Sequence, residues 1–514
     1  MSRTYNTIRN SIWGMVNKII AVLAPFIIRT IIIKELGIDY LGLGSLFTSI
    51  LQVLNMTELG FSSAIVFSMY KPISENDSDK ICALLNLYKK IYNVIGLVIL
   101  ALGLLIMPFI KLVISGTYPN TINIYIVYFL YLINTVISYF LFAYKAAILN
   151  ANQRNDIISN IMSIILLIQY TIQIIVLIVY KNYYLYYIIT PICGVLYNIC
   201  IAIITKYKYP NYYANGSLSK ETLSDIKRRV AGLMVGKICA TTRNSFDSII
   251  ISMFMGLTIV AIYQNYFYIL SNLSGILIVL TTAMSSSIGN SVASESIDKN
   301  YKDFNKVTFL YAWISGWFTV CLLCLYQPFI EMWVGTELMF PLYVVICLCI
   351  YFYVLTSGDI RSLYMNAAGL WWENRYRSIF EAITNLVLNI LLVRIVGISG
   401  IILSTIISIL IFNFFMSSFI LFKHYFKNKN IYCYFISYFK YFMITFIACI
   451  ITYFLTNYLD CFNNRFVNFA VKVFICIIVP NIIFIIFYHK NENFKAVKEM
   501  ISKIFRQSVK EVEV

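Results

Sequence analysis

Apolar residues gather into fourteen stretches that are long enough to cross a lipid bilayer, and short polar segments separate these stretches. A membrane-spanning helix needs about 20 mostly apolar residues. The pattern therefore predicts an all-α polytopic membrane protein, with helix boundaries good to about three residues. The predicted helices cover residues 10–33, 41–69, 91–114, 122–144, 157–180, 183–205, 230–253, 257–284, 305–328, 340–364, 376–397, 399–422, 437–457 and 467–488.

The polar segments between these helices alternate between basic and nearly uncharged. On the fourteen-helix plan, 30 of the 40 Lys and Arg residues fall on one side, five fall on the other side, and five lie inside helices. Cytoplasmic loops carry an excess of Lys and Arg. We therefore expect a membrane protein with both termini in the cytosol. This distribution also accounts for most of the net charge of +17, so we expect no nucleic-acid partner.

The composition excludes several other classes of protein. Of the 514 residues, 60% are hydrophobic and 12% are charged, which leaves too little polar surface for a soluble protein. The two histidines, His424 and His489, lie in basic loops without nearby metal ligands, and no G-x-x-x-x-G-K-[ST] motif is present. Cys321 and Cys324 lie in an apolar run, where we interpret them as small buried hydrophobes. We expect a non-enzymatic protein with no catalytic residues, metal or cofactor.

The sequence also contains a weak internal repeat. Residues 146–154 align with residues 367–375 at an offset of 221, and Lys18 and Gly37 align with Lys237 and Gly256 at an offset of 219. Both offsets correspond to six helices, which predicts two parallel six-helix lobes related by a pseudo-two-fold axis along the membrane normal. The predicted parts are an N-terminal lobe (1–206), a cytosolic linker (207–229), a C-terminal lobe (230–422), an extra helix pair (423–488) and a basic amphipathic cytosolic tail on membrane lipid (489–514).

Four basic residues inside the predicted helices are the candidate substrate-binding residues. Lys18 and Arg29 are eleven positions apart on the first helix, on either side of Pro25, so they lie about 20° apart around its axis. Lys237 and Arg243 lie on the repeat-equivalent helix. Because a buried charge in lipid is costly, these residues predict a cationic cavity wall and an anionic ligand between Lys18 and Lys237. The alternative is that both lysines extend to the membrane surface.

Three acidic residues inside helices are candidates for ion coupling: Asp247, Glu58 and Glu381. Asp247 is spaced to pair with Arg243, and Glu381 shares a helix face with Asn385 and Asn389. Asp359 and Arg361 lie near a predicted helix end, so we expect them at the membrane interface. The 41 tyrosines are explained without a ligand by interfacial aromatic belts and by a general compositional bias.

Several short runs resemble polysaccharide flippases of the Wzx type, which belong to the multidrug/oligosaccharidyl-lipid/polysaccharide (MOP) exporter superfamily. Their order and spacing extend the resemblance from the second predicted helix to the eleventh. The runs are Arg243–Ile251 followed by Gly256 and Tyr263, Glu58–Phe61, Ser287–Asn290, Pro328–Gly335 and Ala368–Arg375.

The resemblance implies two six-helix lobes around a central cavity, two additional helices, and transport of a polyprenyl-pyrophosphate-linked oligosaccharide by alternating access. It implies partners among polysaccharide polymerases and glycosyltransferases of capsule or other surface polysaccharide biosynthesis. Coupling to a H⁺ or Na⁺ gradient is suggested only by relatives. Two alternatives stay open: a multidrug/cation antiporter of the same superfamily, which would favour an acidic cavity, and a membrane glycosyltransferase or polymerase, which would need a sizeable catalytic loop.

Overall fold

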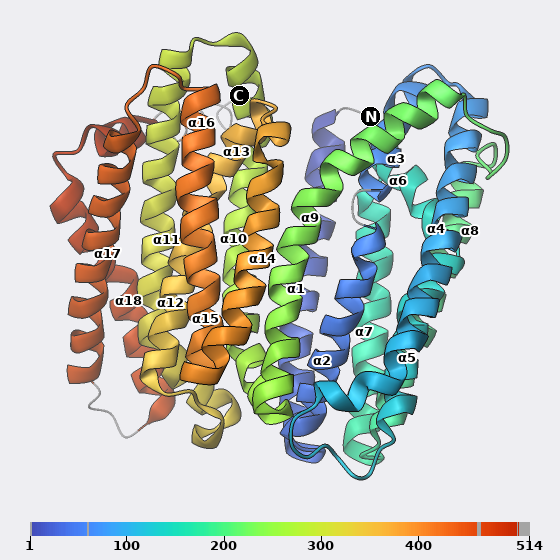
Figure 1. Ribbon diagram of the computed structural model, residues 1–514, viewed down its shortest axis with the longest axis horizontal. Coiled ribbons are helices and arrows are strands. Elements are labelled where there is room, and N and C mark those ends of the chain that lie inside the picture. Colours follow the sequence, from blue (N-terminus) through green and yellow to red (C-terminus); the bar gives the residue numbers. More distant parts are fainter. Residues whose placement is uncertain (1–2, 59–60, 460–463, 501, 503–514) are drawn as a thin grey trace. The chain divides into compact units, whose positions relative to one another are not determined.

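The computed structural model is helical throughout the residues that it describes, which are 3–58, 61–459, 464–500 and 502 (Figure 1). The chain divides into two compact units, Met1–Gln264 and Asn265–Val514. One helix, α10 (Leu257–Ser294), begins in the first unit and continues into the second.

The first unit packs its helices around one apolar core. Helix α1 packs on α7, α7 on α8, α4 on α5, and α2 on α9. Short 3-10 segments interrupt three of the predicted helices, at η1 (Asn55–Glu58), η2 (Met107–Val113) and η3 (Ala143–Lys145). The α-helices are α1 (Arg3–Glu35), α2 (Ile38–Leu54), α3 (Phe61–Ser74), α4 (Ser78–Ile106), α5 (Ile124–Phe140), α6 (Ala146–Ala151), α7 (Asn155–Val179), α8 (Tyr183–Lys208) and α9 (Lys220–Met255).

The second unit is also helical and contains one π-helical segment, η5 (Ile409–Met416), together with the 3-10 segment η4 (Thr336–Leu338). Helices α17 and α18 pack on each other and on α11. After α10, the α-helices are α11 (Ile297–Val334), α12 (Leu342–Thr356), α13 (Asp359–Ala367), α14 (Trp371–Val396), α15 (Ile398–Ser408), α16 (Ser417–His424), α17 (Ile431–Tyr458) and α18 (Arg465–Tyr488).

The start of the predicted C-terminal tail also folds against the second unit. Residues 492–500 are helical, and the ring of Phe494 stacks on Trp313 of α11 with 5.8 Å between centroids. Val497 is buried in the same cluster. The first part of the tail therefore packs its apolar side on protein. Residue 501 and residues 503–514, which include much of the predicted amphipathic pattern, lie outside the described residues.

Eleven described helices are long and apolar enough to cross a membrane, or twelve if the bent pair Ile124–Phe140 and Ala143–Ala151 counts as one span. The fold is therefore an all-helical polytopic membrane protein. In two predicted stretches, 41–69 and 230–253, the described residues give only shorter apolar helices, Ile38–Leu54 and Ser245–Met255, and parts of both stretches lie outside the described side chains.

Six described helices begin more than three residues before their predicted starts, so the expected precision is wrong for them, and the three with the largest errors share one feature. Each of the three has a capping side chain, that of Asp77, Ser219 or Ser296, which accepts a hydrogen bond from a backbone N–H three residues later. Hydropathy detects only the apolar part of a helix, whereas capping sets where the helix starts. These three helices are α4, which begins at Ser78 and not near 91, α9, at Lys220 and not near 230, and α11, at Ile297 and not near 305.

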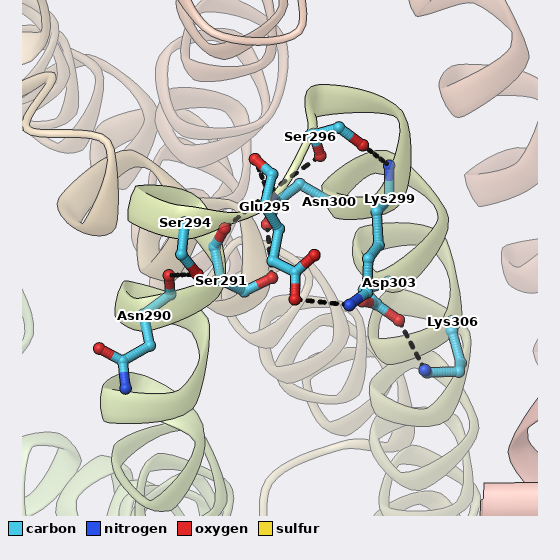
Figure 2. Close-up of polar contacts among 9 residues, drawn as sticks. All are labelled: Asn290, Ser291, Ser294, Glu295, Ser296, Lys299, Asn300, Asp303 and Lys306. Carbon is cyan, nitrogen blue, oxygen red and sulfur yellow. Dashed lines mark hydrogen bonds and ion pairs between the residues drawn. The ribbon is translucent and has the colours of Figure 1, made fainter.

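A compact polar turn joins α10 to α11 (Figure 2). The buried Asn300 of α11 points back to the end of α10 and donates to the backbone oxygens of Ser291 and Ser296 at 2.9 and 3.2 Å. Lys299 pairs with Glu295 across the turn at 2.6 Å. Asn300 thus ties the end of α10 to the start of α11 and fixes the reversal of the chain.

The starts of five helices recur along the chain in the same order. The number of residues between two equivalent starts falls only from 219 in the first pair to 215 in the last pair. This near-constant separation supports an internal duplication. The pairs are Ile38 and Leu257 and also Ser78 and Ile297, each 219 residues apart, Ile124 and Leu342, 218 apart, Asn155 and Trp371, 216 apart, and Tyr183 and Ile398, 215 apart.

The predicted alignment of residues 146–154 with 367–375 is wrong by five positions. The backbone turns left-handed at Gln153 (φ 58°) and at Gly369 (φ 70°), which are 216 residues apart. The N–H groups of these two residues donate to Asn150 and Asn366, again 216 apart. This turn sets the register of the repeat. The offset of 221 came from a chance similarity between the residues on either side of the turn.

Candidate functional site

The two cations predicted on α1 lie at the edge of its packed face. Lys18 is exposed and Arg29 is half-buried. Ile28, next to Arg29, is buried in the core of the first unit, whereas Leu23 is well exposed on the opposite side of the helix. The guanidinium of Arg29 interacts electrostatically with Tyr186 of α8. Both cations therefore lie at the surface of the first unit, and Lys18 is the more exposed of the two.

Helix α9 holds the other predicted cations. Arg243 is half-buried, and Asp247 is only 2% exposed, where it accepts a hydrogen bond from the hydroxyl of Tyr263 at 3.3 Å. The backbone of Lys237 belongs to α9, but its side chain lies outside the part of the chain whose side chains are described. The clamp between Lys18 and Lys237 therefore stays a prediction.

Glu58 lies in the 3-10 segment η1 and is surrounded by tyrosine hydroxyls. Tyr139 of α5 donates to one carboxylate oxygen at 2.7 Å, and Tyr92 of α4 donates to the other. Tyr88 in turn donates to Tyr92 at 2.9 Å. The carboxylate thus fastens the segment that interrupts the predicted helix 41–69 to two neighbouring helices, through a connected chain of hydroxyl groups.

Glu381 begins a buried polar stripe along α14. Its carboxylate pairs with Arg377 at 2.7 Å, with both side chains mostly buried. One and two turns further on, Asn385 donates to Thr405 of α15 at 2.9 Å, and Asn389 accepts from Ser404. The expectation that Glu381, Asn385 and Asn389 share a face sheltered from lipid is confirmed, because all three are buried.

Arg361 is buried inside the protein, which differs from the exposed position expected near a helix end, and Asp359 is half-buried. Arg361 is 1% exposed, and its guanidinium donates to the hydroxyl of Tyr434 at 2.9 Å and to the backbone and side-chain oxygens of Asn413 at 2.5 and 2.9 Å. Asp359 accepts from the hydroxyl of Tyr311. The prediction failed because the apolar pattern breaks at residues 357–358, which is an interruption between α12 and α13 inside the fold.

Two repeat-equivalent helix corners meet within the first unit. Gly37 (φ 110°) separates α1 from α2, and Gly256 (φ 86°) separates α9 from α10, 219 residues later. Two residues after each glycine, Thr258 donates to Asp39 at 2.6 Å.

The backbones at this junction are very close. A Cβ on Gly42 of α2 would overlap the carbonyl oxygen of Leu257 and lie 2.8 Å from its carbonyl carbon. On the other side of the corner, the N–H of Ser115 donates to the carbonyl of Ser252 at 2.9 Å, and the hydroxyl of Ser252 donates to Val113 at 2.7 Å. The corner between α9 and α10 is thus held against α2 and against the segment after η2.

The structure distributes the predicted site residues over separate elements. Six of them lie in the first unit, on α1, η1 and α9, and Glu381 lies in the second unit. Sequence reasoning missed the groups that bind the acids. Arg377 was visible at the i,i+4 spacing from Glu381. The partners of Glu58, Tyr92 and Tyr139, carried no local signal, since they come from other helices.

Comparison with known proteins identifies the family and the fold. A family model described as polysaccharide biosynthesis protein matches residues 7–285. The chain is similar to a structure of the lipid II flippase MurJ in an inward closed conformation, with a TM-score of 0.69, 19% identity, and coverage of 94% of this chain and 99% of that one. No curated protein matches by sequence.

Multidrug transporters of the MATE family share the same fold. For an inward-facing MATE transporter, the TM-score is 0.61 at 13% identity, with 80% of this chain and 96% of that chain covered. For a MATE transporter of Vibrio cholerae, it is 0.58 at 13% identity, with 84% and 100% covered. At these identities the structural likeness establishes the fold alone, that of the MOP superfamily.

Proposed function

The chain belongs to the polysaccharide biosynthesis protein family, and from this premise we propose that it is a flippase for polyprenyl-pyrophosphate-linked oligosaccharide repeat units in the bacterial cytoplasmic membrane. The observation that carries the proposal is the family match over residues 7–285, together with a fold that follows a lipid II flippase along nearly its whole length. The product would serve the synthesis of capsule or another surface polysaccharide.

The proposed topology has fourteen membrane spans with both termini in the cytosol. The two predicted stretches that give only shorter apolar helices, 41–69 and 230–253, are also counted as spans. Interruptions and charged residues are tolerated in helices that line a transport path, because they face a cavity and not lipid. The regular recurrence of helix starts supports two six-helix lobes, 1–206 and 230–422. The distribution of basic residues, 30 against five, supports the orientation.

The proposed mechanism is alternating access through a cationic cavity. Moving a sugar hydroxyl group from water into hydrocarbon without a hydrogen-bond partner costs roughly several kcal/mol. The protein therefore has to offer a polar path. The pyrophosphate binds between Lys18 and Lys237, and Arg29, on the same face of α1 as Lys18, receives it as the cavity opens outward. Arg243 adds positive charge on α9. The polyprenyl tail stays in lipid.

The acidic candidates have different surroundings, which guides their roles in coupling. Glu58 is held by two hydroxyl groups and sits where a helix is interrupted, so we propose it, with Asp247, as a site where H⁺ or Na⁺ resets the transporter. Glu381 pairs with Arg377, so its charge is already balanced in this arrangement. A role for Glu381 in coupling requires that this pair opens.

A multidrug/cation antiporter is the alternative that the shared MATE fold keeps open. Such a protein needs an acid that faces a cationic drug. Each of the three candidate acids accepts a hydrogen bond or ion pair from a protein side chain, whereas Lys18 is exposed. The balance of accessible charge therefore favours an anionic substrate over a cationic one.

The test is transport of the lipid-linked oligosaccharide pool, extracted from the producing bacterium, by protein reconstituted into vesicles. Lys18→Ala and Lys237→Ala are expected to reduce transport at least about tenfold, because each removes a charge from the pyrophosphate site. Lys227→Ala, an exposed lysine in the first turns of α9, is the matched control and should leave transport unchanged. Undiminished transport by both cavity variants would overturn the anion clamp, and no transport by the wild type would overturn the flippase.

A further inference from the structure

The first turns of α14 carry an unusual group of exposed aromatic side chains. Trp371 is 62% exposed, Trp372 is 71% exposed, and Tyr376 is 53% exposed. Large aromatic rings are costly to leave in water, so a group of three within six residues indicates an interaction surface. By the proposed topology, this end of α14 lies at the cytosolic face of the membrane.

The rings are held in place by polar contacts. The guanidinium of Arg375 lies 3.6 Å from the ring centroid of Trp372 and 4.2 Å from that of Tyr376. It also donates to the backbone oxygen of Trp372 at 2.6 Å, and the indole N–H of Trp371 donates to Asn366 at 3.2 Å. Side chains that are already ordered lose little further conformational freedom when a ligand binds.

The equivalent turn of the other repeat has a different chemistry. Helix α7 begins at Asn155 and α14 at Trp371, so Asn155 and Asp156 occupy the positions of the two tryptophans. Asp156 is buried and pairs with Arg154 at 3.0 Å. A helix start at this level of the fold therefore does not require aromatic residues. The tryptophans are specific to the second half, which a general need for interfacial aromatic residues does not explain.

Below the rings, an apolar strip continues along the same side of α14. Phe380, Ile383, Val387 and Leu391 follow Tyr376 at helical spacing, and all four are exposed. At a rise of about 1.5 Å per residue, the strip from Tyr376 to Leu391 is about 22 Å long. The combined surface matches the two parts of a lipid-linked sugar. Its polar and aromatic part lies at the membrane surface, where the sugar would be, and its apolar part lies in the hydrocarbon, where the lipid chain would be.

We propose that Trp371, Trp372, Arg375 and Tyr376 form an entry site for the saccharide headgroup of a lipid-linked glycan at the cytosolic surface. This inference rests on the proposed function and adds a site outside the predicted cavity. The C–H faces of the sugar ring stack on the exposed faces of the indoles. Arg375 offers further N–H donors to hydroxyl or phosphate oxygens, since a guanidinium has five. The polyprenyl chain lies along the apolar strip.

The experiment compares two lipid probes on purified protein in lipid nanodiscs: the lipid-linked oligosaccharide pool extracted from the producing bacterium, and polyprenyl phosphate without sugar. The double variant Trp371→Leu with Trp372→Leu is expected to bind the sugar-bearing lipid about tenfold more weakly, and polyprenyl phosphate equally well. Trp371→Phe with Trp372→Phe keeps the aromatic faces and should retain most of the affinity. Tyr343→Leu, an equally exposed aromatic at the start of α12, is the matched control and should have no effect.

Each other outcome has a distinct meaning. Equal loss of affinity for both probes would show a general lipid anchor and overturn the saccharide site. Unchanged affinity for both probes in a folded leucine variant would also overturn it. If the wild type does not bind the sugar-bearing lipid at all, the proposed flippase function fails, whereas binding that is insensitive to the tryptophans leaves that function intact.

Discussion

Replacing Gly42 with alanine tests the close contact between the two repeat-equivalent helix corners. The added Cβ would overlap the carbonyl oxygen of Leu257, which belongs to the backbone of α10 and not to a flexible side chain. The clash can be relieved only by moving α2 or the start of α10. The same substitution at Gly14, in α1, meets nothing within 4 Å. Both variants add one methyl group to a helical glycine, and they differ only in what that methyl group would contact.

The magnitudes decide the sign of each effect. Alanine stabilises the interior of a helix by about 1 kcal/mol relative to glycine. Overpacking a tight contact costs typically about 1–3 kcal/mol. We therefore expect Gly14→Ala to stabilise the protein by up to about 1 kcal/mol, and Gly42→Ala to destabilise it by about 0–2 kcal/mol. For a cooperative unit of about 250 residues, this difference of about 1–3 kcal/mol corresponds to apparent melting temperatures roughly 2–12 °C apart.

The assay is gel filtration of fluorescently labelled, detergent-solubilised protein after heating to a series of temperatures. The wild type should melt between the two variants or close to the Gly42 variant. If Gly42→Ala melts at or above the temperature of Gly14→Ala, the backbone contact between α2 and α10 is not as close as described.

Two further substitutions test other parts of the fold. Arg361→Met leaves acceptor groups of Asn413 and Tyr434 buried, so heating should reveal a loss of about 2–4 kcal/mol, whereas the exposed Lys427→Met should not; identical melting curves would contradict this. Asp39→Cys with Thr258→Cys should form a disulfide on oxidation, unlike either single variant, because the two side chains are in contact; failure to cross-link would contradict this contact.

The local features of the chain were read correctly where they depend on composition. The apolar stretches predicted an all-helical membrane protein, and short motifs predicted membership of a polysaccharide biosynthesis family of MOP fold. Both are confirmed. The buried stripe of Glu381, Asn385 and Asn389 was also predictable, because one helix sets the spacing of all three residues and lipid penalises polar groups on an exposed face.

Features that depend on backbone geometry were read less well. The start of α4 was missed by thirteen residues, because the cap at Asp77 lies in a polar segment that hydropathy ignores. The repeat was found, but its register around residue 153 was wrong, since a left-handed turn carries little sequence signal when Gln and Gly occupy equivalent positions. Residues that match by chance can shift a sequence alignment, whereas the hydrogen bonds of the turn identify the equivalent positions directly.

The sequence by itself determined that the chain forms membrane helices, how its basic residues divide between the polar segments, and which charges lie inside helices. These properties follow from the transfer of single residues between water and lipid, which needs no knowledge of neighbours. Only the tertiary structure decided which partners those charges have. Tyr92 and Tyr139 reach Glu58 from two other helices, and Arg361 is buried against a π-helical segment, where its partner Asn413 lies 52 residues away. Such contacts depend on how helices pack, and a residue carries no local record of the helix that will lie beside it.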